Sequence, residues 1–166
     1  MTMAKVLPIV LFAAVAIGQQ TKSPGMYVDQ NGTLIKLAVA PHPTLQIKSR
    51  FVKASGAWIF RGAEAPVQLP MMHPRFVLYG SSDHFVIVEL DKKSDHREAQ
   101  AATSSLLGAH GGFDEKKTID TTATKRSDDG LDVSPEKDLK SGEYLITTEV
   151  APRQAYDFSI QTETHK

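Results

Sequence analysis

Residues 142–160, GEYLITTEVAPRQAYDFSI, decide the fold class of this chain. Apolar, aromatic and β-branched residues recur at every second position over 144–150 and again over 156–160. A period of two residues is typical of β-strands, because successive side chains in a strand point to opposite faces of the sheet. Pro152 separates the two runs, and proline cannot donate to a strand ladder. The stretch therefore predicts two consecutive strands.

The rest of the chain carries similar short apolar runs separated by turn signals. Asn31-Gly32 lies between two such runs, and this pair is the strongest short-range signal for a β-hairpin because both residues tolerate a positive φ. No helical period of 3.6 residues extends beyond two turns. Short strands at spacings of about 8–12 residues predict an all-β, antiparallel sandwich or a sheet closed on itself.

Tyr144 refines this expectation, because it follows Gly142 at the head of an alternating strand with one strand still to come. This is the setting of a tyrosine corner, in which the hydroxyl bonds backward to the main chain at a Greek-key crossover. Gly142 and Tyr144 are thus candidate structural residues, and they favour an immunoglobulin-like (Greek-key) β-sandwich. The alternative is a half-buried strand tyrosine without a special partner.

Several of these segments together resemble a group of uncharacterised exported β-sandwich proteins from soil bacteria. The segments are WIFRGAEA (58–65), FVIVELDKK (85–93) with Arg97-Glu98, GEY (142–144) and YDF (156–158). The group usually has Pro-Gly before Glu-Tyr and Gly after Tyr-Asp-Phe, where this chain has Ser141 and Ser159. The resemblance implies a fold and an extracytoplasmic address, and no activity.

The first eighteen residues have the composition of a secretory signal peptide. Lys5 precedes an apolar run over 6–17, and Ala16-Ile17-Gly18 offers small residues before Gln19. The run is shorter than the roughly 20 residues of a spanning helix, so we expect cleavage after residue 18 and no permanent membrane span. An uncleaved anchor and a buried helix are the alternatives. The expected organisation is then a signal peptide (1–18), a tether (19–25), one β-sandwich domain (26–161) and a polar tail (162–166).

Composition excludes several classes of function. Lys plus Arg and Asp plus Glu are both 19, so the chain lacks the basic excess of nucleic-acid-binding proteins. It has no cysteine, which excludes disulfides, thiolate nucleophiles and thiolate metal sites. An exported chain without cysteine indicates a bacterial periplasmic or secreted protein.

The sequence gives little support for a metal or cofactor, and none is predicted. The six histidines lack the spacing of a zinc motif, and Asp128-Asp129-Gly130 lacks the ligand spacing of a calcium loop. Met71-Met72-His73 offers soft ligands for copper(I), but adjacent residues of a strand point to opposite faces. The charged segment 91–98 is expected to be the solvated end of a hairpin.

Two classes of function follow. The first is an exported, non-catalytic binding module for a protein, peptide or glycan. The alternative is an extracytoplasmic hydrolase with a site assembled from dispersed side chains such as His73, Asp83 and His84. A structural subunit that joins other chains through an exposed edge strand is a third candidate.

Recognition on a sandwich is usually delegated to its loops, and the longest stretch without a strand signal is 104–117. Within it, His110, Gly111, Gly112 and Phe113 form the candidate partner-binding loop. The alternative is that the apolar side chains of this loop cap the core.

Overall fold

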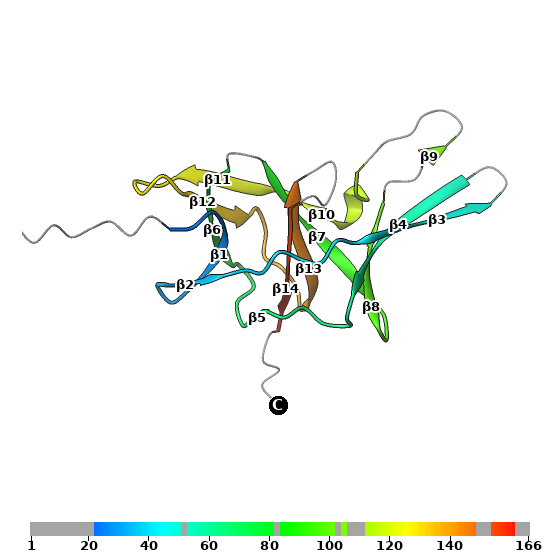
Figure 1. The fold of residues 1–166 in the computed structure, drawn as a ribbon, viewed down its shortest axis with the longest axis horizontal. Coiled ribbons are helices and arrows are strands. Elements are labelled where there is room, and N and C mark those ends of the chain that lie inside the picture. Colours follow the sequence, from blue (N-terminus) through cyan, green and yellow to red (C-terminus); the bar gives the residue numbers. More distant parts are fainter. Residues whose placement is uncertain are drawn as a thin grey trace, which may run out of the picture.

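The computed structural model describes residues 22–50, 53–81, 84–101, 104–105, 112–148 and 154–161. In these ranges the chain forms strands and one short 3-10 helix, so the predicted all-β class is confirmed (Figure 1). None of the described residues belongs to a helix that is long and apolar enough to cross a membrane. The elements are β1 (Gly25–Gln30), β2 (Thr33–Lys36), β3 (Thr44–Arg50), β4 (Lys53–Arg61), β5 (Gln68–Leu69), β6 (Arg75–Tyr79), β7 (Phe85–Lys92), β8 (His96–Gln100), β9 (Ser104–Ser105), η1 (Glu115–Lys117), β10 (Thr118–Ile119), β11 (Thr121–Lys125), β12 (Leu131–Pro135), β13 (Gly142–Thr148) and β14 (Ala155–Ile160).

The strands form two sheets. The first has the order β11-β12-β6-β1-β2, and the second the order β3-β4-β8-β7-β13-β14-β5, with β10 beside β7 and β9 beside β4. All pairs are antiparallel except β14 with β5, which is parallel, so the second sheet is mixed. The all-β, largely antiparallel part of the expectation therefore holds, and the immunoglobulin-like Greek-key order is not confirmed.

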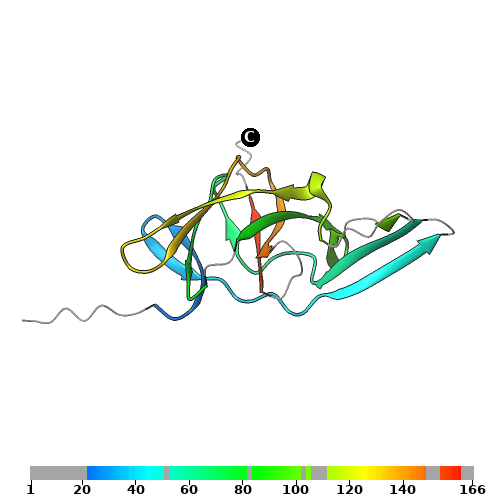
Figure 2. The same cartoon turned by 90° about the horizontal axis from the view of Figure 1, so that it is seen from above.

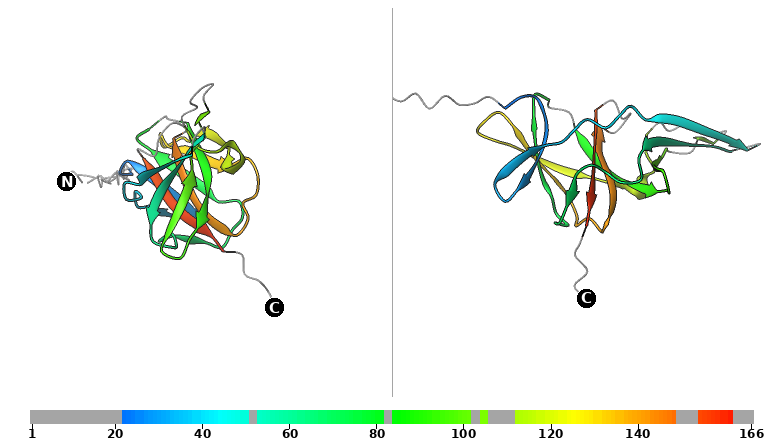
Figure 3. Two further views of the ribbon diagram at one scale, coloured as in Figure 1. Left: turned by 90° about the vertical axis from the view of Figure 1, so that its right-hand side faces the viewer. Right: turned by 60° about the horizontal axis from the view of Figure 1, so that its bottom comes forward.

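Two junctions join the sheets into one closed wall. On one side β10 pairs with β7 and β11 pairs with β12, and only Asp120 separates β10 from β11. On the other side Val39, which follows β2, forms a bridge to Tyr156, and the Ala40 N–H donates to the Ala155 carbonyl at 2.7 Å. The strands β1, β6, β12, β11/β10, β7, β13 and β14, together with the segment after β2 at Val39, thus follow one another around a ring. In the right-hand view of Figure 3, β14 (red) lies between the blue β1–β2 hairpin and the ribbon of β3 and β4.

The period of two in the strands serves two large cores and a smaller cluster of Tyr27, Val77 and Tyr79. In β7, Phe85 and Ile87 point into the wall, whereas Val86, Val88 and Leu90 point out of it. The main core inside the wall contains Met26, Val28, Leu37, Leu69, Phe76, Leu78, Phe85, Ile87, Ile119, Val133, Leu139, Tyr144, Ile146, Tyr156, Phe158 and Ile160. The second core lies outside it and contains Ala40, Phe60, Val86, Val88, Leu90, Ala99, Phe113, Leu145 and Ala155, with Trp58 packed against them.

The second core is covered by β4 and β8, which together with β3 and β9 we call the hairpin arm. Figure 2 shows β3 and β4 extending from the wall as a long two-stranded ribbon. Trp58 and Phe60 near the end of β4 pack against the wall, while the pairs nearer the hairpin turn lie beyond it. The arm therefore has an anchored base and a projecting end.

Two local predictions are confirmed. Asn31 and Gly32 have φ of 54° and 84°, and they connect β1 to β2 in the predicted hairpin. The Tyr144 hydroxyl donates to the Lys140 carbonyl at 2.8 Å, which is the backward bond expected of a tyrosine corner. Burial, and then the charge of Glu89, raise the pKa of Tyr144, so its hydroxyl stays protonated and able to donate.

The ends of the chain relate to the expected organisation as follows. Residues 1–18 and 162–166 lie outside the described residues. The expected tether is described from Lys22 onward, and there the Ser23 carbonyl accepts a hydrogen bond from the Tyr27 hydroxyl at 2.8 Å. The last part of the tether therefore contacts β1.

Candidate functional site

The candidate partner-binding loop is described only in part. His110 and Gly111 lie outside the described residues, and Gly112 has a φ of 132°, in the region that favours glycine. Phe113 is 7% exposed, forms a bridge with Ala101 and belongs to the second core. Its side chain therefore caps the core, as in the alternative weighed above, and the partner-binding role of the loop stays a prediction.

The two histidines suggested for a dispersed hydrolase site lie on either side of β6. His73 precedes β6, and its Nδ1 lies 3.1 Å from Oδ1 of Asp138, with both side chains exposed. His84 follows β6, a strand whose five residues span about 17 Å. Asp83 lies outside the described residues. Among the residues that are described, no three His, Asp or Glu side chains are grouped so that they could hold a metal ion.

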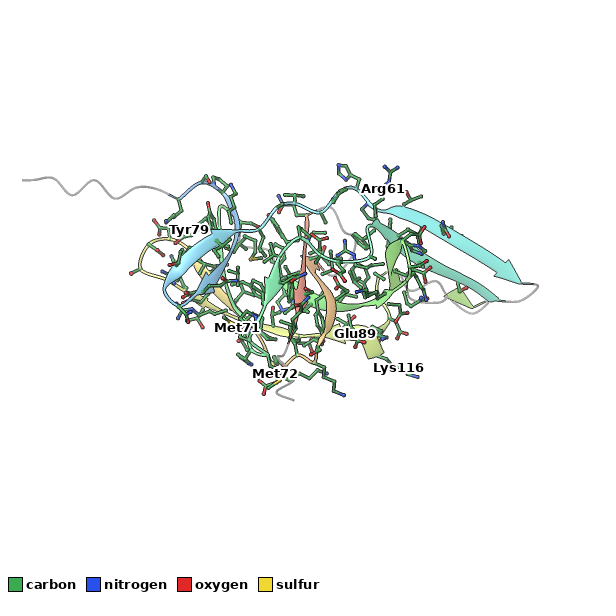
Figure 4. The ribbon with its side chains drawn as sticks, turned by 90° about the horizontal axis from the view of Figure 1, so that it is seen from below. Arg61, Met71, Met72, Tyr79, Glu89 and Lys116 are labelled. Carbon is green, nitrogen blue, oxygen red and sulfur yellow. The ribbon has the colours of Figure 1, made fainter. Side chains whose placement is uncertain are left out.

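The methionines suggested for copper(I) differ in exposure. Met71 packs against the main core, whereas Met72 is exposed, as expected of neighbouring residues with opposite orientations. Figure 4 labels both.

Buried charges lie at the base of the hairpin arm instead. Arg97 in β8 is 2% exposed, and its Nη2 donates to Oδ2 of Asp157 in β14 at 2.7 Å. Its Nη1 lies 3.6 Å from Oε2 of Glu143 in β13, which also accepts the Ala65 N–H at 2.8 Å. We call Arg97, Asp157 and Glu143 the charge clamp, because they join the arm to the outer face of the wall.

The charge clamp also fixes the end of β4. The Arg97 guanidinium donates from Nε to the Gly62 carbonyl at 3.0 Å and from Nη2 to the Arg61 carbonyl at 3.2 Å. Because all three charged side chains are buried, a substrate has no access to them. The arrangement can hold β4 and β8 in place, and it has no reacting group in contact with solvent.

Arg97 corrects one expectation. Segment 91–98 was expected to be solvated, yet Arg97 lies with Ala99 on the buried face of β8, while His96 and Glu98 between them are less buried. A signal for this was present in the sequence, since Asp157 interrupts an otherwise apolar aromatic run and implies a buried cation. Arg97, the glutamate of Gly-Glu-Tyr (Glu143) and the aspartate of Tyr-Asp-Phe (Asp157) thus form the charge clamp.

The free surface of the arm is the edge of β3. Within the described chain, β3 pairs with β4 on one side and with no strand on the other. Leu45 is 42% exposed and Ile47 67%, and Ile47 is the most exposed of the large apolar side chains that the structure describes. A strand edge presents unpaired N–H and C=O groups, which are a template for another extended chain.

A shallow cleft near the start of β1 is a weaker candidate. It has a volume of about 220 Å³ and is lined by Lys36, Tyr79 and Tyr156 among others. That volume is below the roughly 300–1,000 Å³ of ordinary ligand pockets. Its cation is already engaged, because Lys36 Nζ donates to Ser23 Oγ at 2.9 Å and lies over the Tyr27 ring.

Comparison with protein-family models, with curated proteins and with solved structures gives no match to this chain. The resemblance to exported proteins of soil bacteria therefore stays a prediction, and the function is argued from the geometry alone.

Proposed function

We propose that this protein is an extracytoplasmic, non-catalytic binding module that takes an extended polypeptide onto the free edge of β3. The observation that carries the proposal is an edge strand on a projecting ribbon, in which Leu45 and Ile47 are exposed. Adding a strand to such an edge gains main-chain hydrogen bonds for affinity, and alternate side chains give specificity.

The base of the arm supports this role. Trp58 and Phe60 pack into the second core, and the charge clamp fixes β8 and the end of β4. A binding edge held in its bound shape loses little conformational entropy when a partner arrives. The wall thus serves as the support and the arm as the binding element.

The first experiment asks whether recognition uses the main chain of the partner. The full-length chain is used to select binders from a display library of extended peptides, and Trp58, the single tryptophan, reports binding through its fluorescence. Each selected peptide is then made in two versions, N-methylated at odd or at even positions. Because alternate residues of a strand bond to one side, pairing with β3 predicts that one version loses binding and the other keeps it. Equal binding by both versions refutes the proposal.

Matched substitutions locate the site. Ile47→Ser in β3 is expected to weaken binding, whereas Ile35→Ser in β2 is expected to leave it unchanged, although Ile35 is also exposed at 38% and lies on a terminal strand. Equal losses in the two variants contradict binding at β3.

Export is the second part of the proposal, and it is supported by the composition of residues 1–18. Intact mass spectrometry of protein recovered outside the cytoplasm is expected to show Gln19 as the first residue. A recovered species that retains Met1 contradicts cleavage.

A further inference from the structure

The hairpin arm carries an unusual distribution of charge. From residue 30 to residue 63 the chain has no acidic residue, in a sequence that has 19 of them overall. The same stretch holds five basic residues, namely Lys36, Lys48, Arg50, Lys53 and Arg61. All of β3 and β4 fall inside it, so this ribbon has no acid of its own to balance its cations.

Several basic residues elsewhere in the described chain have acidic partners. The ion pairs within 4 Å include Arg75–Asp29, Lys92–Glu64, Lys93–Glu98, Lys117–Glu89 and Arg126–Asp128. Arg61, at the end of β4, is exposed and has no acidic partner among the described residues. Figure 4 shows it at the root of the arm, apart from Glu89 and Lys116 at the lower edge of the molecule.

The sequence of β3 indicates what a second strand must offer. Leu45-Gln46-Ile47-Lys48-Ser49-Arg50 alternates apolar or small residues with polar or basic ones. Opposite charges facing one another across a strand pair are stabilising, and like charges are destabilising. Acidic residues in a paired strand would therefore complement Lys48 and Arg50, and basic residues would oppose them.

We infer that the partner of β3 is an extended polypeptide segment with acidic residues at every second position. This inference rests on the proposed function and adds the chemistry of the partner to it. Anionic lipid or nucleic acid would complement only the positive charges of the arm. A phosphate surface has no alternating N–H and C=O groups to pair with the free main-chain groups of β3. An acidic strand satisfies both the main chain and the charge of β3.

The test compares two blocked peptides of about ten residues. One alternates Thr with Glu and the other Thr with Gln, so they differ in charge and keep the same spacing. Binding to the full-length chain is followed by Trp58 fluorescence and by calorimetry. At about 0.05 M salt we expect the Glu peptide to bind at least about fivefold more tightly. At about 0.5 M salt we expect this advantage to shrink, because surface charges are then screened within a few ångström.

Variants place the effect on the arm. The double variant Lys48→Gln/Arg50→Gln is expected to lose the preference for the Glu peptide and to keep its weak binding of the Gln peptide. The control Lys125→Gln, in exposed strand β11, is expected to keep the preference. Circular dichroism melting checks that each variant is folded.

Each other outcome overturns a different claim. Equal binding of the two peptides overturns the acidic partner and leaves β3 as a binding edge. Loss of the preference in Lys125→Gln as well overturns its location on the arm. Binding of neither peptide, together with binding of phosphatidylglycerol vesicles, overturns both the acidic strand and the proposed function, and indicates a lipid surface.

Discussion

Replacing Arg97 with methionine is expected to lower the free energy of unfolding by about 3–5 kcal/mol. The substitution removes the 2.7 Å bond to Asp157 and the bonds to the carbonyls of Gly62 and Arg61. A hydrogen bond to a charged group contributes about 1.5–3 kcal/mol. The carboxylates of Asp157 and Glu143 then remain buried without a cation, while methionine fills much of the same volume, so the loss is mainly electrostatic.

Urea unfolding, followed by circular dichroism and by Trp58 fluorescence, measures this change. Lys92→Met is the control, because Lys92 also forms an ion pair, at 2.7 Å from Glu64, but on the exposed surface. Such surface pairs contribute little. If Arg97→Met shifts the unfolding midpoint no more than Lys92→Met does, the reasoning about a buried clamp is refuted.

A double-mutant cycle separates the pair from its surroundings. Asp157→Leu alone leaves Arg97 buried with only Glu143 nearby, so it is expected to destabilise strongly. The double variant Arg97→Met/Asp157→Leu is expected to be more stable than the sum of the single effects by about 2 kcal/mol or more. Additive effects would show that the two side chains do not interact. Hydrogen exchange is expected to rise first in β4 and β8, which the clamp attaches to the wall.

Three further predictions follow from single contacts. Tyr144→Phe is expected to cost about 1–2 kcal/mol in chemical unfolding, because the Lys140 carbonyl loses its donor; an unchanged midpoint would mean that the hydroxyl bonds to water instead. The Glu98 and then the Asp95 carboxylate raise the pKa of His96, so its stabilising contribution is complete below about pH 6.5 and is lost as the pH rises through the higher pKa of the folded state. Wild type should therefore exceed His96→Gln in melting temperature by more at pH 5.5 than at pH 8.5, and a constant difference would contradict this. Gly62→Ala is expected to lower the free energy of unfolding by about 1–2 kcal/mol, because Gly62 has a φ of 85°. Gly80→Ala is expected to lower it by at least about 1 kcal/mol more, because Gly80 has a similar φ of 81° and an added Cβ would also lie 2.8 Å from Pro24 Cβ. Equal losses in thermal unfolding would contradict the clash with Pro24.

Local features of the fold were predictable from the sequence. Asn31-Gly32 fixes its turn by backbone geometry, and the backward bond of Tyr144 spans only four residues. The closure of the wall was not predictable, because it depends on the pairing of Val39 with Tyr156, which are far apart in the chain. The sequence of a single strand does not determine which distant strand it will pair with.

The candidate site was predictable to a smaller degree. Phe113 was a candidate binding residue because it is apolar and lies in a loop. The sequence around such a residue is the same whether its side chain caps a core or faces water, and in the structure Phe113 caps the core. Arg97 lies in a charged segment of eight residues, and nothing in that segment distinguishes it from its neighbours. It is buried because it lies on the face of β8 that packs against the wall. The exposure of Ile47 follows from β3 being last in its sheet, which is a property of the whole topology.

The ring of strand pairings determines when the wall can close during synthesis of the chain. Its final segment, β14, is the last of the described strands to leave the ribosome, and all six of its residues are buried. Until it arrives, β13 and the segment around Val39 lack a neighbour, and both cores stay open to water. Contacts between distant residues form slowly, and unfinished sheets are prone to aggregate. A chain cut before residue 155 is therefore expected to aggregate, because its unpaired strand edges and open cores persist after synthesis.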